Sequence, residues 1–520
     1  MKTKLRTAED CVAAIPDGAT VAISGSGGGL MEPDHLLAAL EARFLATGHP
    51  RDLTAVHALG IGKVGAQGMN RLAHEGMVRR VIGGHWTWSP QMQALAREEK
   101  IEAYTLPAGA IMLLMREIGA GRPGLITHVG LNTFADPRHG GGACNARSTD
   151  PICELVEIGG RSYIRYLPFK VDFGILRGTQ ADPLGNVSCW HEAADIDART
   201  VALAAHNSGG KVFAQVQAMA ARGSVPARLV TVPGVLVDGV AVDPDQTQTH
   251  LGAYDPALWG EAGPRLGGKA PPGEGPEGIR RIIASRAADE IRAGASVNFG
   301  YGIPGGIPAI LAERGLLDEI WITVEQGMHN GQLLDGSLFG AARYPDAIVS
   351  SVDQFDFYSG GGIDQAFLGM GEMDGEGNVN VSRLGRDVVG PGGFVDITQN
   401  AHTVVFCGAF EAKGVRYDPV EGGLRVAAPG AVPKLVDRVR EITFSGANAR
   451  ATGQTVLYVT ERAVFRLADK GVELIEVARG IDVRRDVLDR LGFAPIVARD
   501  PAPMDARHFA PPPVDSSHAA

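Results

Sequence analysis

The sequence has few cysteines, and none of them are paired in a metal or redox motif. Five occur in 520 residues, at positions 11, 144, 153, 189 and 407. An odd number without a CxxC pair argues against a disulfide framework or a zinc site and is typical of a reducing compartment. The chain also lacks an apolar run of ~18 residues, which predicts no membrane span. Glu9 and Asp10 lie where a signal peptide would need an apolar core. We therefore expect a cytoplasmic protein.

The sequence has no excess of positive charge either. Lys and Arg number 49 against 59 for Asp and Glu, which gives a net charge of −10. This balance argues against a nucleic-acid partner. The motifs HExxH, GxSxG and GxxxxGK[ST] are absent, so nothing points to a zinc protease, a serine hydrolase or a P-loop enzyme. Glycine, in contrast, is abundant, with 70 residues that cluster between apolar runs and predict turns and close-approach loops.

Short β-rich runs alternate with amphipathic helical stretches along the chain. Residues 19–29 read as a strand and Gly-rich turn before a helix at 33–48, and residues 295–306 do the same before 307–315. Such alternation predicts βαβ units and mainly parallel sheets. The sequence therefore predicts an α/β fold.

An internal repeat divides the chain into two halves. Residues 172–187 resemble 364–379, and the motif DGATVAISGSGG from Asp17 resembles AGASVNFGYGIPGG from Ala293. A weaker third pair, from His206 and from Thr398, follows in the same order. The unequal offsets imply extra residues in the first half, at around 80–165. The predicted organisation is a domain at 1–259, a Gly- and Pro-rich linker at 260–278, a second domain at 279–503 and a flexible tail at 504–520.

The Gly-rich loop Ser24–Leu30 allows one alternative function. Glycines between a strand and a helix let backbone amides approach an anionic ligand, as in a dinucleotide oxidoreductase. The loop lacks clean GxGxxG spacing, and no acidic residue ends a second strand about 20 residues on. The pattern therefore gives only weak support to dinucleotide binding.

Glu325 directly follows a run of apolar residues that predicts a buried strand at 320–324. In open α/β sheets, ligands bind outside the carboxyl ends of the strands. A solvated glutamate at a strand end is the simpler interpretation of one such residue. The matching strand of the first half places Ala58 at this position. A carboxylate in one half alone is expected if the halves diverged and one kept the chemistry.

Several longer motifs resemble family I CoA-transferases of the fused, single-chain type. In the first half these are Pro107-Ala-Gly109, AGRPGLITHVGLNTFADPR from Ala120 and AAHNSGGKVFAQV from Ala204. In the second half they are NFGYGIP, TVEQG, DQFDFYSGGGID, DGEGNVNVSRLG and GPGGFVDITQNA. The resemblance covers nearly the whole chain. It implies two related open α/β domains of the CoA-transferase (NagB/RpiA-like) kind.

The resemblance also implies site residues and a mechanism. Glu325 matches the catalytic glutamate, and Gly393 matches a glycine whose amide binds an oxyanion. The loop that holds the pantetheine arm of CoA falls on Gly300, Tyr301, Gly302, Ile303 and Pro304, with Gly361 and Gly362 in a second loop close to the site. CoA would pass from an acyl-CoA donor to a small carboxylic acid through a glutamyl-CoA thioester, in a ping-pong reaction. CoA and acyl-CoA are substrates there, and no other cofactor or metal is expected. A homo-oligomer, dimer or tetramer, is expected.

Two departures from the family pattern concern the acyl substrate. The family has Gln where this chain has Ala108, and it has small residues where Met328, His329 and Asn330 stand. We expect Ala108, His329 and Asn330 to line the substrate pocket and Ala108 to make room for an acceptor bulkier than acetate. The missing donor would be replaced either by an ordered water or by a new donor, for which His329 and Asn330 are the candidates.

Two alternatives share the predicted fold. Water that reached Glu325 would make the protein an acyl-CoA hydrolase, and loss of chemistry would leave a non-catalytic acyl-CoA-binding protein. Comparing acyl transfer with release of free CoA separates the first alternative from the transferase. The intact glutamate at the strand end argues against the second.

Overall fold

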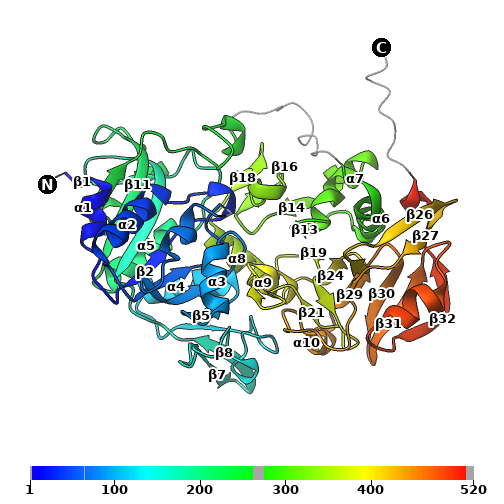
Figure 1. The fold of residues 1–520 in the computed structure, drawn as a ribbon. Helices are drawn as coiled ribbons and strands as arrows, with labels where there is room; N and C mark the ends of the chain where they lie inside the picture. Colours follow the sequence, from blue (N-terminus) through cyan, green and yellow to red (C-terminus); the bar gives the residue numbers. More distant parts are fainter. Residues whose placement is uncertain (1–2, 64, 262–274, 511–520) are drawn as a thin grey trace, which may run out of the picture.

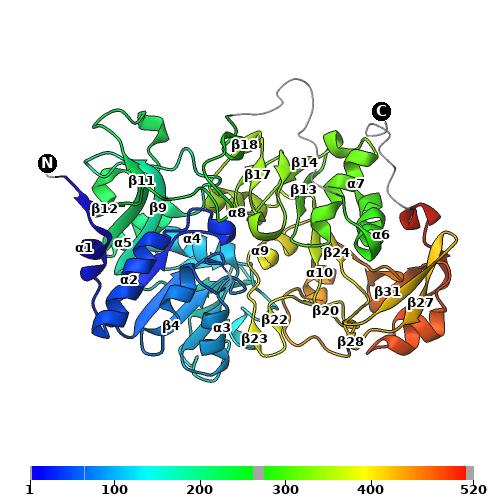
Figure 2. The same ribbon diagram turned by 45° about the horizontal axis from the view of Figure 1, so that its top comes forward.

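Residues 3–63, 65–261 and 275–510 are described by a computed structural model. Two large sheets lie side by side, one in each half of the chain, and helices α8 and α9 lie between them (Figures 1 and 2). Within the described residues, no helix combines the length and the apolar character that crossing a membrane requires.

The first sheet has nine strands, and its eight-strand path is parallel throughout. The short strand β10 (Val187–Ser188) pairs antiparallel with β9 off this path. In spatial order the path is β1 (Leu5–Arg6), β12 (Gly239–Val242), β11 (Lys211–Met219), β9 (Phe173–Ala181), β2 (Thr20–Ile23), β3 (Leu53–His57), β4 (Val78–Gly83) and β5 (Glu102–Thr105).

Helices cover both faces of this sheet. The helices on one face bury their apolar sides in one core, and those on the other face bury theirs in a second core. One core takes α4 (Ala108–Gly119) and α5 (Ala198–Asn207). The other takes α1 (Ala8–Ala13), α2 (Asp34–Thr47) and α3 (Pro90–Arg97). A parallel sheet buried on both faces is the arrangement that the strand–helix alternation predicts.

The second sheet has ten strands. Their spatial order is β18 (Ala347–Ile348), β15 (Met328–His329), β14 (Trp321–Thr323), β13 (Ser296–Phe299), β19 (Gln365–Gly369), β24 (Thr403–Cys407), β29 (Thr455–Val459), β30 (Ala463–Ala468), β31 (Gly471–Val477) and β32 (Ile496–Pro503). The five strands from β14 to β29 are parallel. Its helices are α6 (Gly278–Ala287), α7 (Ile307–Glu313), α8 (Ser351–Ser359), α9 (Phe394–Thr398) and α10 (Gly446–Thr452).

The parallel parts of the two sheets have the same neighbour order. The series β3-β2-β9-β11-β12 in the first corresponds to β14-β13-β19-β24-β29 in the second. The first half also has a small antiparallel sheet, in the order β6 (Leu125–Thr127), β8 (Arg161–Tyr166) and β7 (Cys153–Ile158). This sheet does not belong to the series of strands that the two halves share. It falls within the region where extra residues were predicted.

One tight turn is repeated with the same hydrogen bonds in both halves. Oδ1 of Asp182 accepts hydrogen bonds from the backbone N–H groups of Leu184 and Asn186. In the same way, Oδ1 of Asp374 accepts hydrogen bonds from the backbone N–H groups of Glu376 and Asn378. The side chain of Asn186 donates to Asp182 Oδ2 at 2.9 Å, and that of Asn378 donates to Asp374 Oδ2 at 3.1 Å. The repeated sequence therefore builds the same local structure twice.

The predicted flexible tail is partly wrong. Residues 504–510 pack on the second domain, where His508 is 1% exposed and its Nδ1 lies 3.0 Å from the Ser285 hydroxyl on α6. Arg507 pairs with Asp289 at 2.8 Å. The Pro-rich sequence alone does not reveal these partners, because Ser285 and Asp289 lie more than 200 positions away in the chain. Residues 511–520, and the part of the predicted linker at 262–274, lie outside the described residues.

Candidate active site

Glu325 follows the carboxyl end of β14, at the edge where the two domains meet. Val297 of β13 pairs with Ile322 of β14, and Val21 of β2 pairs with Ala55 of β3. Three residues beyond Ile322 comes Glu325, and three residues beyond Ala55 comes Ala58. The strand registers therefore place Ala58 at the position in the first sheet that Glu325 occupies in the second.

The carboxylate of Glu325 accepts one hydrogen bond on each oxygen. The backbone N–H of Gly393 donates to Oε2 at 3.0 Å, and Nε2 of Gln326 donates to Oε1 at 3.1 Å. Removal from water raises the pKa of Glu325 to about 7, although both donors act in the opposite direction. A carboxylate held in this way is a stronger base and nucleophile than one in water.

Gly393 precedes α9, and the space beside its Cα is occupied. A Cβ atom there would lie 2.2 Å from Oε2 of Glu325 and 2.9 Å from the ring of Phe355. Any larger residue would push the carboxylate away from the N–H group. The predicted oxyanion glycine is thus in direct contact with the predicted nucleophile.

The first domain contributes backbone groups that hold the loop before Gly393. The N–H of Gly392 donates to the carbonyl of Gly84 at 2.9 Å, and its carbonyl accepts the N–H of Ala108 at 2.8 Å. His85 lies beside the same loop, since a Cβ on Gly392 would be 4.0 Å from its Cδ2. Burial lowers the pKa of His85 to about 4, so its imidazole is neutral near pH 7. Both domains therefore build the surroundings of Glu325.

Ala108 is the first residue of α4 and is fully buried at this contact. Its methyl group brings no hydrogen-bond donor toward Glu325. The predicted position next to the reacting carboxylate is compatible with the structure, because Ala108 touches Gly392 through its backbone.

His329 and Asn330 have their polar atoms engaged elsewhere. Nδ1 of His329 accepts from the indole of Trp321 at 2.8 Å, and its Nε2 lies 2.9 Å from the Gln354 side-chain oxygen. Asn330 accepts the N–H of Ile322 at 2.9 Å and donates to Asp346 at 2.8 Å. Among the described residues, no hydrogen bond joins either side chain to Glu325. Their predicted role as replacement donors therefore lacks a contact, and Gln326, which we did not predict, makes one.

The loop Gly300–Pro304 follows the carboxyl end of β13, next to Glu325's strand. Gly302 has φ +87° and no atom within 4 Å of a Cβ built on it, so the backbone there is open to a ligand. A cavity of about 540 Å³ is lined by Gly302 together with, among others, Gly306, Leu333 and Arg280. The loop and the cavity together offer an extended surface beside the second sheet.

Gly361 and Gly362 lie at the opposite edge of that sheet. They precede β19, and the carbonyl of Gly362 accepts the hydroxyl of Ser296, the first residue of β13. Because the strands are parallel, the four residues of β13, at ~3.3 Å each, separate Gly362 from Gly300. The prediction that they lie close to the site is wrong for this chain, because it ignored the direction of the strand that follows them.

The Gly-rich loop of the first domain is filled by protein. A Cβ on Gly27 would lie 2.4 Å from the indole nitrogen of Trp88, one on Gly28 would lie 2.3 Å from the carbonyl of Ser337, and one on Gly29 would lie 2.6 Å from the ring of His250. The glycines permit close contact between loops, so their conformation supports no dinucleotide site.

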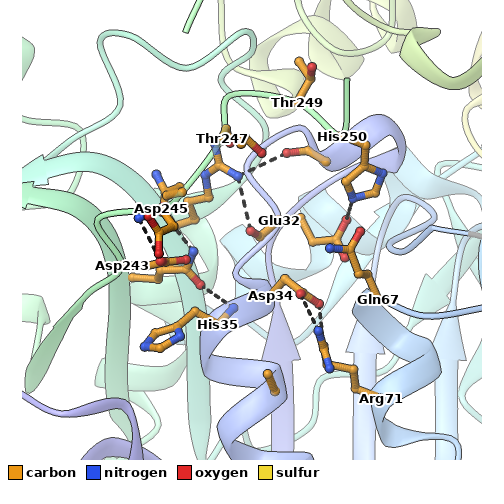
Figure 3. A pocket seen from close by; sticks show the side chains of 15 residues that line it. Glu32, Asp34, His35, Gln67, Arg71, Asp243, Asp245, Thr247, Thr249 and His250 are labelled. Carbon is orange, nitrogen blue, oxygen red and sulfur yellow. Dashed lines mark hydrogen bonds and ion pairs between the residues drawn. The ribbon is translucent and has the colours of Figure 1, made fainter. Parts of the chain in front are cut away.

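A second cavity, of about 250 Å³, lies in the first domain next to this loop (Figure 3). It is lined mainly by polar side chains, and several of these are paired. Asp34 binds Arg71 at 2.7 Å, and Glu32 lies 3.1 Å from His250. The cavity contains none of the predicted site residues.

Sequence reasoning missed Gln326 and Asp396. Asp396 lies on α9 with 1% of its surface exposed, and burial together with the nearby charge of Glu325 raises its pKa to about 8. Both residues stand inside motifs that we singled out, so the signal was a polar residue in a buried motif. No cluster of three or more metal-ligating side chains occurs among the described residues.

Known proteins resemble this chain over nearly its whole length. A model of the coenzyme A transferase family matches residues 5–243. Acetate CoA-transferase YdiF of Escherichia coli K12 is 38% identical over 503 residues, 97% of this chain and 94% of that protein. Caffeate CoA-transferase of Acetobacterium woodii is 40% identical over 514 residues, 97% of each. The crystal structure of the acyl-CoA transferase YdiF from E. coli O157:H7, in a thioester complex with CoA, matches with a TM-score of 0.92 and 36% identity, covering 98% of this chain and 96% of that one.

Proposed function

This chain belongs to the CoA-transferase family, in its fused single-chain form, and we propose that Glu325 is the residue that carries CoA between the two carboxylic acids. The observation behind this assignment is the contact between Glu325 Oε2 and the N–H of Gly393. An ionised carboxylate is already a nucleophile and needs no general base. The neutral His85 nearby is not required to remove a proton.

In the first half-reaction, an oxygen of Glu325 attacks the thioester carbonyl of the donor. The C–S bond breaks, its electron pair leaves with CoA as a thiolate, and a mixed anhydride remains. The thiolate then attacks Cδ of Glu325, and the bond from Cδ to the bridging oxygen breaks. The donor acid leaves with that oxygen, and a glutamyl-CoA thioester is formed. No proton is gained or lost, and the energy of the thioester is conserved.

The second half-reaction reverses these steps with an acceptor carboxylate. Each attack on Cδ puts negative charge on an oxygen of Glu325, where the Gly393 N–H donates. One such donor is worth ~10²–10³ in rate. Water must stay out because it would hydrolyse the anhydride. Two first-domain segments, the turn at Gly84 and the start of α4 at Ala108, contact Gly392 on this side.

We place CoA along the second domain, over Gly300–Pro304 and the adjoining cavity. The open backbone at Gly302 supports this placement. The acceptor is proposed to be bulkier than acetate, since alanine at position 108 is shorter than the glutamine of the family pattern. The two domains are proposed to derive from one duplicated unit, the first at 1–259 and the second at 279–503, with residues 504–510 packed against the second. A homo-oligomer and a cytoplasmic location remain predictions.

The test is to trap the intermediate. The protein is incubated with acyl-CoA without an acceptor, digested and mapped by mass spectrometry. The proposal requires a CoA adduct on Glu325 and its absence from a folded Glu325→Ala variant. An adduct on another residue during turnover would overturn it. The hydrolase alternative predicts release of free CoA at a rate that an added carboxylic acid does not change.

A further inference from the structure

The side chain of Gln326 turns back onto the carboxylate of the preceding residue. Its Nε2 donates to Oε1 of Glu325 at 3.1 Å, and the residue is buried, with 3% of its surface exposed. Among the described residues, this amide and the N–H of Gly393 supply the hydrogen bonds to the Glu325 carboxylate. Each oxygen therefore has its own donor, one from the backbone and one from a side chain.

The amide of Gln326 is fixed by a glycine on a neighbouring loop. Gly340 has φ +101°, and a Cβ built on it would lie 2.5 Å from Cδ of Gln326 and 2.7 Å from Nε2. Only a glycine leaves room for the amide in this position. The loop therefore holds Nε2 against Glu325 rather than letting the side chain turn to solvent.

The other end of the same amide is left without a partner. Oε1 of Gln326 is buried and accepts no hydrogen bond within the described part of the chain. A buried polar atom in this condition costs about 1–3 kcal/mol. An apolar side chain of similar length would avoid this loss, so stability does not account for a glutamine here. The contact with Glu325 Oε1 is what the glutamine adds.

The two oxygens of Glu325 have different fates in the proposed reaction. When the CoA thiolate attacks Cδ, one oxygen stays as the oxyanion, and the other departs within the donor acid. When an acceptor carboxylate attacks the thioester, one of its oxygens bonds to Cδ, the Cδ–S bond breaks, and the electron pair leaves with the CoA thiolate. The departing and entering oxygens occupy the same place, and both carry negative charge.

We propose that Gln326 is a catalytic residue that binds this exchanging oxygen. With Gly393 on the oxyanion, Nε2 of Gln326 donates to the carboxylate that enters or leaves at Oε1. The amide thereby selects carboxylates over water as the nucleophile that discharges the thioester. The inference rests on the proposed role of Glu325 and concerns the acid substrate, while CoA binding is left to the Gly300–Pro304 loop.

The test uses Gln326→Met and Gln326→Glu in the full-length protein. Methionine keeps the length without the donor, and glutamate replaces the NH₂ group with an oxygen. Gln365→Met is the matched control, because Gln365 is also 3% exposed but bonds to the backbone of Glu290 and Arg292 at the far end of the sheet. Rapid quenching with intact-protein mass spectrometry follows the Glu325–CoA thioester as it forms and as acids of increasing concentration discharge it, and thermal unfolding checks each fold.

The proposal expects discharge by the acid to slow ~10²-fold in folded Gln326→Met and more in Gln326→Glu. The share of thioester lost as free CoA to water should rise, the concentration of acyl-CoA that half-saturates loading should stay near the wild-type value, and Gln365→Met should discharge at the wild-type rate. Wild-type discharge and an unchanged hydrolytic share in either folded Gln326 variant would overturn the role of Gln326. A wild-type protein that forms no adduct on Glu325 would instead overturn the proposed function beneath it.

Discussion

The backbone N–H of Gly109, in the first domain, donates to Oδ2 of Asp396, in the second, across 3.2 Å. Gly109 belongs to the first turn of α4, and Asp396 lies on the helix that Gly393 precedes. A Cβ on Gly109 would be 2.4 Å from the other oxygen of Asp396. The position of Gly393, and through it the hydrogen bond to Glu325, therefore depends on a contact that both domains make.

Asp396→Asn should flatten the pH dependence of stability. Burial raises the pKa of Asp396 to about 8 in the folded protein, against 3.8 for an ordinary aspartate. Between these two pH values the folded state therefore binds more protons than the unfolded state. The contribution of Asp396 to the free energy of unfolding is present at low pH and is lost as the pH rises toward 8. Asparagine keeps the oxygen for Gly109 without a proton to lose. Urea unfolding at pH 5 and pH 8 measures the slope, with exposed Asp500→Asn as control. An unchanged slope in Asp396→Asn would contradict the burial argument.

Gly393→Ala should lower kcat/KM by at least ~10²-fold. The new Cβ would lie 2.2 Å from Oε2 of Glu325 and so displace the carboxylate from its donor. Steady-state kinetics and thermal unfolding measure the effect. Gly252→Ala is the control, because nothing lies within 4 Å of a Cβ there. Activity within a few-fold of wild type would show that the Gly393 N–H does not support the reaction.

The rate of thioester formation should rise with pH to a plateau above about pH 8. Burial raises the pKa of Glu325 to about 7, and only the ionised carboxylate attacks. Below this pKa the rate should fall by about tenfold for each pH unit. Single-turnover loading from acyl-CoA between pH 5 and 9 gives the profile, with unfolding checked at each pH. A profile that is flat above pH 5 would mean that Glu325 titrates as an ordinary glutamate.

Gly302→Val and Gly361→Val form a matched pair that tests where CoA lies. Both glycines have positive φ, +87° and +83°, and open space around the missing side chain. The backbone strain should therefore be similar. We expect Gly302→Val to raise the acyl-CoA KM at least ~10-fold, since the branched side chain blocks the ligand surface, and Gly361→Val to leave it near the wild-type value. Equal effects would place CoA elsewhere.

Ala108→Gln should penalise bulky acids more than acetate. Ala108 is fully buried, and its N–H donates to the carbonyl of Gly392, so a longer side chain at this position would crowd the surroundings of the loop that carries Gly393. The measurement is kcat/KM for acetate and for a series of branched and aromatic acids. A uniform change, or a gain for the bulky acids, would show that position 108 does not set the size of the pocket.

Sequence patterns predicted the α/β class and the place of Glu325 at a strand end, whereas its neighbour Gly393 was implied by the family resemblance. A buried apolar run that ends in a glutamate locates the residue at a strand end, and parallel strands bring such ends together. Gly361 and Gly362 were misplaced because a motif does not show whether it precedes or follows its strand. In the predicted tail, His508 is buried by Ser285 and Asp289, which are over 200 positions away.

The missed residues share a physical cause. Gln326 matters because its side chain folds back on Glu325 under Gly340, and Asp396 matters because α4 of the other domain covers it. Both facts depend on packing between segments distant in the sequence. Local periodicity carries no information about such packing.

Because the same turn occurs once in each half, the effect of disrupting it on unfolding can be compared between the two halves of one protein. Asp182 and Asp374 hold the same ring of hydrogen bonds, and the amide oxygens of Asn186 and Asn378 accept the N–H of Gly234 at 2.8 Å and of Gly446 at 3.0 Å. Replacing either aspartate by alanine removes this shared set of bonds from one half at a time, and in Asp374→Ala it also removes the bond that Asp374 Oδ2 accepts from the N–H of Val439 at 3.3 Å. A difference in the denaturant midpoint between these two variants then reports this extra bond together with how strongly each half cooperates with the rest of the molecule.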